Sequence, residues 1–128
     1  GLEEFRNREL SQLSGGQRQR VFIAMALAQN TKILFLDEPT TYLDIRYQLD
    51  ILRLVKKLNR EYGITIVMVL HEINQAIHFS DEVIGLKDGK VLVQGDPKDV
   101  ITTESISELY DVHLNVADID GQKFVLTV

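Results

Sequence analysis

Four consecutive apolar residues, Ile33–Leu36, are followed directly by two carboxylates, Asp37 and Glu38. An apolar run of this length predicts a short strand that is buried on both faces of a sheet. The carboxylates then lie at the end of that strand, where open α/β sheets bind their ligands. Because an isolated carboxylate is costly to bury, the pair indicates that one carboxylate binds a metal ion and the other binds a proton. The alternative is a strand that ends in a polar turn, with Asp37 capping the next element.

A helix is predicted after this strand, from Asp44 to about Arg60, with Gly63 as its stop signal. Asp44 has an ordinary explanation as the N-cap of that helix. One face of the helix is expected to be buried, and it carries Ile45, Leu49, Leu52, Val55 and Leu58.

A second apolar run, Ile64–Leu70, predicts a second buried strand, and His71 follows it. Strand, helix and strand at this spacing form a right-handed crossover with parallel strands. We therefore expect His71 at the same sheet edge as Asp37 and Glu38. A lone histidine at a strand end is more often structural, but an edge shared with two carboxylates reverses that preference.

Upstream, Ser14, Gly15, Gly16 and Gln17 lead into a predicted helix over Arg18–Gln29. Unpaired N–H groups at a helix start bind phosphate, and glycines allow an anion to approach closely. The competing interpretation is an ordinary N-cap at Ser14 followed by a flexible turn.

The rest of the chain predicts five shorter elements. These are a helix over Glu72–Phe79, a hairpin around Asp88-Gly89, a helical turn started by Asp96-Pro97, a helix over Thr103–Tyr110 with Thr103 as N-cap, and a hairpin around Asp120-Gly121.

The composition excludes several classes of function. The 128 residues carry a net charge of -5 and no basic stripe beyond Arg18 and Arg20, so duplex nucleic acid is not an expected partner. The absence of cysteine excludes disulfides and thiol chemistry. The longest apolar run, Ile64–Leu70, is too short to cross a bilayer.

Together these motifs resemble the nucleotide-binding domain of ABC transporters. Leu13-Ser14-Gly15-Gly16-Gln17-Arg18-Gln19-Arg20 matches the signature motif of that family, and Ile33–Glu38 matches its Walker B strand with the following glutamate. Tyr42-Leu43-Asp44 is similar to the D-loop, with Tyr42 where alanine is frequent. His71 stands at the switch-histidine position.

The resemblance implies a role for each of these positions. Asp37 would hold Mg²⁺, Glu38 would orient and polarise the attacking water, and His71 would contact the γ-phosphate of ATP. Asp44 would communicate across a dimer. The signature residues Ser14, Gly15, Gly16 and Gln17 would bind ATP held by a second ATPase subunit, so two chains would clasp two nucleotides head to tail.

The chain also departs from the family pattern, because no Gly-x-x-x-x-Gly-Lys-Ser/Thr phosphate loop occurs in it. We therefore expect the C-terminal part of such a domain, with residues 1–30 ending a helical subdomain and residues 31–128 carrying the Walker B, D-loop and switch regions. The expected fold class is α/β, an incomplete parallel sheet of the P-loop NTPase type flanked by helices and followed by β-hairpins. Alone, this piece should not hydrolyse ATP.

Within the family, Thr40–Asp44, Tyr47-Gln48 and His71–Ala76 are similar to importers of iron-siderophore, haem or cobalamin. This implies transmembrane permease subunits as partners, an extracytoplasmic binding protein as an indirect partner, and a peripheral place on the cytoplasmic face of the cell membrane. One alternative is a soluble ABC-family ATPase that regulates binding to nucleic acid or the ribosome. Another is that the piece is only a folding or interaction module.

Overall fold

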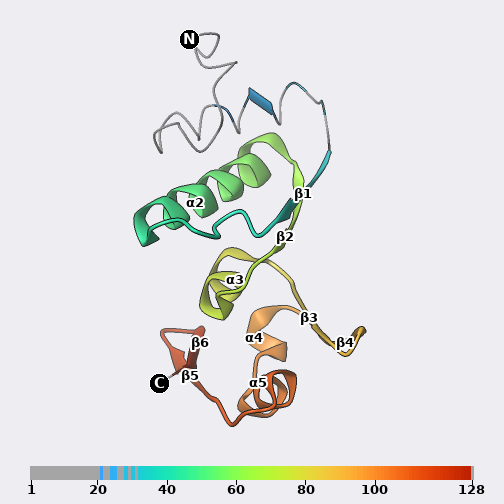
Figure 1. Cartoon of the computed structure of the whole chain (residues 1–128), viewed down its shortest axis with the longest axis vertical. Helices are drawn as coiled ribbons and strands as arrows, with labels where there is room; N and C mark the ends of the chain where they lie inside the picture. The colour runs from blue at the N-terminus through green and yellow to red at the C-terminus, as the bar shows by residue number, and fades with distance from the viewer. Residues whose placement is uncertain (1–20, 22–23, 26–27, 29, 31, 128) are drawn as a thin grey trace. The chain divides into compact units, whose positions relative to one another are not determined.

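The computed structural model describes residues 21, 24–25, 28, 30 and 32–127. Within this part of the chain, strands and helices form an α/β fold (Figure 1). The chain divides into two compact units, Gly1–Leu70 and His71–Val128. The first unit contains a parallel strand pair and the second contains two antiparallel hairpins, which confirms the expected fold class.

The first unit has the predicted strand, helix and strand. Strand β1 (Ile33–Asp37) leads into helix α2 (Ile45–Tyr62), which returns the chain to strand β2 (Thr65–Val69). The two strands pair in parallel, with Ile33 opposite Thr65 and Asp37 opposite Val69. Their carboxyl ends therefore meet at one edge, as the spacing predicted.

Helix α2 ends at the predicted glycine. Gly63 is in the left-handed conformation, with φ 65°, and its N–H donates to the carbonyl oxygen of Asn59. The Asn59 side chain then donates to the carbonyl oxygen of Ile64 at 2.8 Å, which fixes the start of the return to β2. The helix extends to Tyr62, slightly beyond the predicted end at Arg60.

The predicted buried face of α2 is only partly correct. Ile45 was expected inside, but 64% of its surface is exposed, because it occupies the first turn of the helix. The helix also buries residues beside the predicted stripe, and its buried set is Ile51, Leu52, Leu54, Val55 and Leu58. A wide apolar face rather than a narrow stripe therefore holds α2 in place.

The prediction that the first strand is buried on both faces is wrong. Leu34 and Ile66 pack against the buried side chains of Leu58 and Ile64. The opposite face of the strand pair is exposed, and Phe35 keeps 73% of its surface accessible. A helix against one side of a two-stranded sheet leaves the other side open, and the apolar residues there are Ile33, Phe35, Val67 and Val69.

The second unit contains seven short elements, which agree with the predicted series. They are α3 (Ile73–Phe79), β3 (Val83–Lys87), β4 (Lys90–Gly95), α4 (Pro97–Val100), α5 (Thr103–Tyr110), β5 (Asn115–Ile119) and β6 (Gln122–Leu126). A core of Ile77, Ile101, Ile106 and Val125 joins α3, α4, α5 and β6.

Both hairpins turn at the predicted Asp-Gly pairs. Asp88 and Gly89 have φ values of 52° and 75°, and Asp120 and Gly121 have φ values of 52° and 79°. Positive φ at both central residues is typical of the type I′ turn, whose twist matches that of the flanking strands.

The predicted N-cap of α5 is one residue too late. Thr102, not Thr103, is the cap: its side chain accepts from the Ser105 N–H at 3.0 Å, and the Thr102 N–H donates to the Ser105 hydroxyl at 2.9 Å. Such a reciprocal box needs a polar side chain three residues after the cap. Ser105 provides it for Thr102, whereas Thr103 would meet Ile106.

In the described part of the chain, no helix is long and apolar enough to span a membrane.

Candidate functional site

The candidate site begins at the carboxyl end of β1. Asp37 is the last residue of the strand and its side chain is exposed. Glu38 follows in the left-handed region, with φ 52°, and its N–H donates to the carbonyl oxygen of Val69 at 2.9 Å. This bond continues the ladder between the strands by one residue. The half-buried Glu38 is therefore anchored by its backbone at the junction of β1 and β2.

A tight turn follows the two carboxylates and contacts the Glu38 side chain. The Thr41 N–H donates to the Glu38 carbonyl oxygen at 3.2 Å, and the Thr41 hydroxyl lies 3.4 Å from Oε2 of Glu38. Thr40 is buried, with 8% of its surface exposed. Sequence reasoning did not single out Thr41, although a hydroxyl three residues after a carboxylate in a turn was an available signal.

The next loop connects this turn to α2. The Leu43 N–H donates to the Thr40 carbonyl oxygen at 3.3 Å, and Nε2 of Gln48 donates to the Leu43 carbonyl oxygen at 2.8 Å. Gln48 thus holds the loop from the first turn of the helix. Sequence reasoning used Gln48 only as part of a family pattern and did not predict this bond.

Asp44 occupies the N-cap position of α2, as its ordinary explanation predicted. However, its side chain makes no capping hydrogen bond, and only its carbonyl oxygen takes part, accepting from the Gln48 N–H at 2.9 Å. The exposed carboxylate is therefore not used to cap its own helix. Asp37, Glu38 and Asp44 all belong to the first unit.

His71 is exposed and is the first residue of the second unit. It follows β2 closely in the chain, since that strand ends at Val69. The next residue, Glu72, has a structural role, because its carboxylate accepts from the backbone N–H groups of Asn74 and Gln75 and caps α3. The proximity of the His71 ring to the two carboxylates of the first unit stays a prediction.

The signature residues Ser14, Gly15, Gly16 and Gln17 lie outside the described residues. Their role therefore also stays a prediction.

The chemistry of Asp37 fits the expected Mg²⁺. Among the described residues, no group of three or more His, Cys, Asp or Glu side chains could hold a metal. Mg²⁺ does not need such a cage, because it usually keeps several waters and binds one or two carboxylates together with substrate phosphates. A single exposed carboxylate at a strand end is a suitable donor for that arrangement.

Sequence comparisons relate the chain to transport proteins. Residues 1–41 match the family described as ABC transporter. The chain is 47% identical over 118 residues to the ferric enterobactin transport ATP-binding protein FepC of Escherichia coli K12, covering 92% of this chain and 44% of FepC. It is 50% identical over 115 residues to the petrobactin import ATP-binding protein FpuC of Bacillus anthracis, covering 90% of this chain and 42% of FpuC. The chain thus spans less than half the length of these relatives.

Solved structures of ABC transporter proteins are also similar to this chain. An inward-facing ABC transporter assigned to the metal-chelate type matches with a TM-score of 0.74 at 31% identity, over 92% of this chain and 47% of that one. The ATP-binding cassette MJ0796, in a dimeric post-hydrolysis state with ADP and Pi, matches with a TM-score of 0.57 at 49% identity, over 73% of this chain and 40% of that one.

Proposed function

We propose that this chain, which belongs to the ABC transporter ATP-binding family, provides catalytic carboxylates of an ATPase that powers import across a membrane. The observation that carries the proposal is the position of Asp37 and Glu38 at the carboxyl end of a parallel strand, with Glu38 bonded to Val69. Ligands of open α/β sheets bind at this edge. Because the chain spans 44% of FepC, the activity belongs to the complete protein that carries it.

Glu38 is the proposed general base. A water would add to the γ-phosphorus of ATP as the bond to the bridging oxygen of ADP breaks, and its proton would pass to the Glu38 carboxylate. The backbone bond to Val69 and the contact with the Thr41 hydroxyl support this role, since both restrict the position of Glu38. Asp37 would hold Mg²⁺, which neutralises charge on the phosphates when bound.

The remaining site residues would complete the phosphate environment. His71 would contact the γ-phosphate, and Ser14, Gly15, Gly16 and Gln17 of a second subunit would bind the same nucleotide. Phosphoryl transfer depends mainly on positioning and charge stabilisation, so a site closed by two chains is chemically reasonable. The exposed Asp44 carboxylate, free of a capping bond, would be available at the contact between the chains.

The proposed cargo is a ferric siderophore. Three relatives at 47% to 50% identity are named for ferric enterobactin, petrobactin and iron(3+)-hydroxamate transport. None of these three names mentions haem or cobalamin. The complete protein would work at the cytoplasmic face of the membrane with transmembrane permease subunits, and an extracytoplasmic binding protein would deliver the cargo to them.

The substitution Glu38→Gln in the complete protein tests the proposal. The amide keeps the shape of the side chain but cannot accept a proton, so single-turnover hydrolysis should fall about 10²–10⁴-fold while ATP binding persists. Glu61→Gln is the matched control, because Glu61 is an exposed carboxylate of α2. It should hydrolyse ATP at the parent rate. Near-normal single-turnover hydrolysis by Glu38→Gln would remove Glu38 from the role of base.

A further inference from the structure

His71 is joined directly to the N-cap of helix α3. Glu72 is that cap, because its backbone is extended, with φ -82° and ψ 110°, while its carbonyl oxygen accepts the first helical bond from the Ala76 N–H at 3.1 Å. The chain therefore changes from extended to helical one residue after His71. The direction in which the chain leaves His71 is set at Glu72.

Both carboxylate oxygens of Glu72 are bonded to the first turn of α3. Oε1 accepts from the Asn74 N–H at 3.2 Å, and Oε2 accepts from the Gln75 N–H at 2.8 Å. These N–H groups have no carbonyl partner inside the helix. An N-cap side chain commonly accepts from only one of these two positions, and the preferred residues are shorter than glutamate. The double bond pattern of Glu72 therefore fixes the start of α3 more firmly than a single cap bond would.

The first turn of α3 is itself held by the rest of the second unit. The Asn74 side chain makes two hydrogen bonds with the backbone of Val125 in β6. Gln75, the next residue, is 8% exposed. The two N–H groups that Glu72 accepts thus belong to a well-supported turn, so the cap ties the residue after His71 to the packed part of the second unit.

We propose that Glu72 is a positioning residue for His71. The inference rests on the proposed function, in which the His71 ring contacts the γ-phosphate of ATP. With the cap in place, the backbone beside His71 has one conformation, and little entropy is lost when the ring meets the phosphate. Without the cap, the first turn of α3 loses two bonds and the backbone at Glu72 gains freedom. Glu72 does not touch the nucleotide and acts through His71.

The test measures single-turnover ATP hydrolysis by the complete protein at saturating ATP and Mg²⁺. Glu72→Ala should lower the rate about 5–30-fold, the ratio that corresponds to the loss of a strong N-cap. Glu72→Asp keeps a carboxylate on a residue that is preferred at N-caps, and its rate should stay within about twofold of the parent. ADP affinity should be equal in all variants, because ADP lacks the γ-phosphate that His71 would contact.

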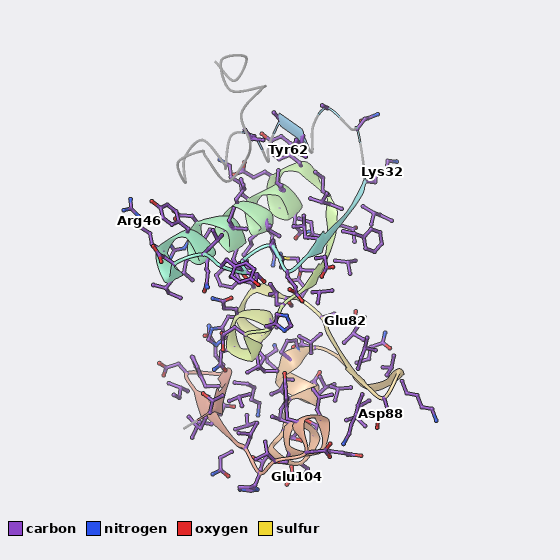
Figure 2. All side chains as sticks on the ribbon, in the orientation of Figure 1. Lys32, Arg46, Tyr62, Glu82, Asp88 and Glu104 are labelled. Carbon is purple, nitrogen blue, oxygen red and sulfur yellow. The ribbon has the colours of Figure 1, made fainter. Side chains whose placement is uncertain are left out.

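Thr102→Ala is the matched control, because Thr102 caps α5 in the same unit through its bonds with Ser105. Figure 2 shows Glu104, in the first turn of α5, well apart from α3. Thr102→Ala should lower the free energy of unfolding in urea as Glu72→Ala does, but it should leave the rate of hydrolysis unchanged. Equal slowing by the two variants would assign the effect to the stability of the second unit and overturn the inference.

A double-mutant cycle with His71→Ala shows whether Glu72 acts through the histidine. His71→Ala alone should slow hydrolysis, and adding Glu72→Ala should slow it no further. Independent effects that multiply in the double variant would overturn the inference. A parent-like rate for Glu72→Ala, with His71→Ala slow, would overturn the inference and leave the proposed function intact. A parent-like rate for His71→Ala would remove His71 from the proposed site, and the inference with it.

Discussion

Asn74 pairs with the backbone of Val125 in the way that a neighbouring strand would. Its Oδ1 accepts from the Val125 N–H at 2.8 Å, and its Nδ2 donates to the Val125 carbonyl oxygen at 3.1 Å. The two residues are 51 positions apart, so this pair of bonds joins α3 to β6 within the second unit. Val125 is 3% exposed, and water has little access to replace Asn74.

The substitution Asn74→Ala should destabilise the second unit by about 2–4 kcal/mol, because two buried backbone groups lose their partners. Urea unfolding followed by far-UV circular dichroism measures the change. Asn115→Ala is the control, since Asn115 makes its side-chain contact with His113 at an exposed site. A cost for Asn74→Ala no greater than that of the control would mean that Val125 finds other partners.

Gly95 should not tolerate alanine. Its φ is 143°, and a Cβ built there would lie 2.9 Å from Cγ1 of Val100. Backbone strain and the clash with Val100 would both destabilise Gly95→Ala. Gly89→Ala is the comparison for strain without a clash, because Gly89 also has a positive φ but has nothing within 4 Å of the added Cβ. We expect a loss of about 1–3 kcal/mol at Gly95, larger than at Gly89.

The double substitution Gly95→Ala with Val100→Ala tests this explanation of the Gly95 result. Removing the Val100 methyl groups should recover part of the loss if the clash contributes to it. Purely additive effects of the two substitutions would assign the whole loss to the backbone of Gly95.

Deprotonation of Tyr110 should lower the free energy of unfolding at alkaline pH. Burial raises the pKa of its phenol, and repulsion from Glu72 adds to the rise. A raised pKa means that the folded chain holds the proton more tightly, so the stability present below about pH 10 is lost as pH rises through the folded pKa. Absorbance of tyrosinate should show one group, absent in Tyr110→Phe, that titrates above free tyrosine.

The Tyr110→Phe variant also separates this effect from that of Lys87. The hydrogen bond to Asp111 raises the pKa of Lys87, whose loss of charge changes stability in the same direction. Only the tyrosine contribution should disappear in Tyr110→Phe. An unchanged alkaline unfolding profile in that variant would assign the whole dependence to other groups.

The two faces of the β1 and β2 pair should respond differently to truncation. Leu58→Ala removes a side chain that is fully buried beneath one face and should cost about 2–5 kcal/mol. Phe35→Ala removes a larger side chain from the open face and should cost less than about 1 kcal/mol. Similar losses by denaturant unfolding would show that the open face is covered in solution.

Local patterns were sufficient to predict the elements that depend on neighbours in the sequence. The strand before Asp37, the helix stop at Gly63 and the turn at Asp88-Gly89 were all predicted correctly, because each depends on a few adjacent residues. Burial was harder to predict. Phe35 and Ile45 are apolar but exposed, and their exposure depends on which elements pack nearby.

The candidate site was also predicted only in part from the sequence. Asp37 and Glu38 were predicted as site residues because they stand at the end of an apolar run, and the parallel pairing of that strand was predicted from its spacing to β2. The bond from Gln48 to Leu43 was missed, because a glutamine in a helix carries no signal of which carbonyl it will meet. His71 begins the other unit, so its part in the site remains a prediction.

The two units should also fold in a definite order. Each hairpin of the second unit closes through a two-residue Asp-Gly turn, and such hairpins form in about 1–10 μs. Strand β1 pairs with β2 across the 18 residues of α2, and contacts between residues so far apart in the sequence close more slowly. In a refolding experiment, amides of the hairpins should therefore become protected before those of β1, so Asp37 and Glu38 at the end of β1 are positioned late.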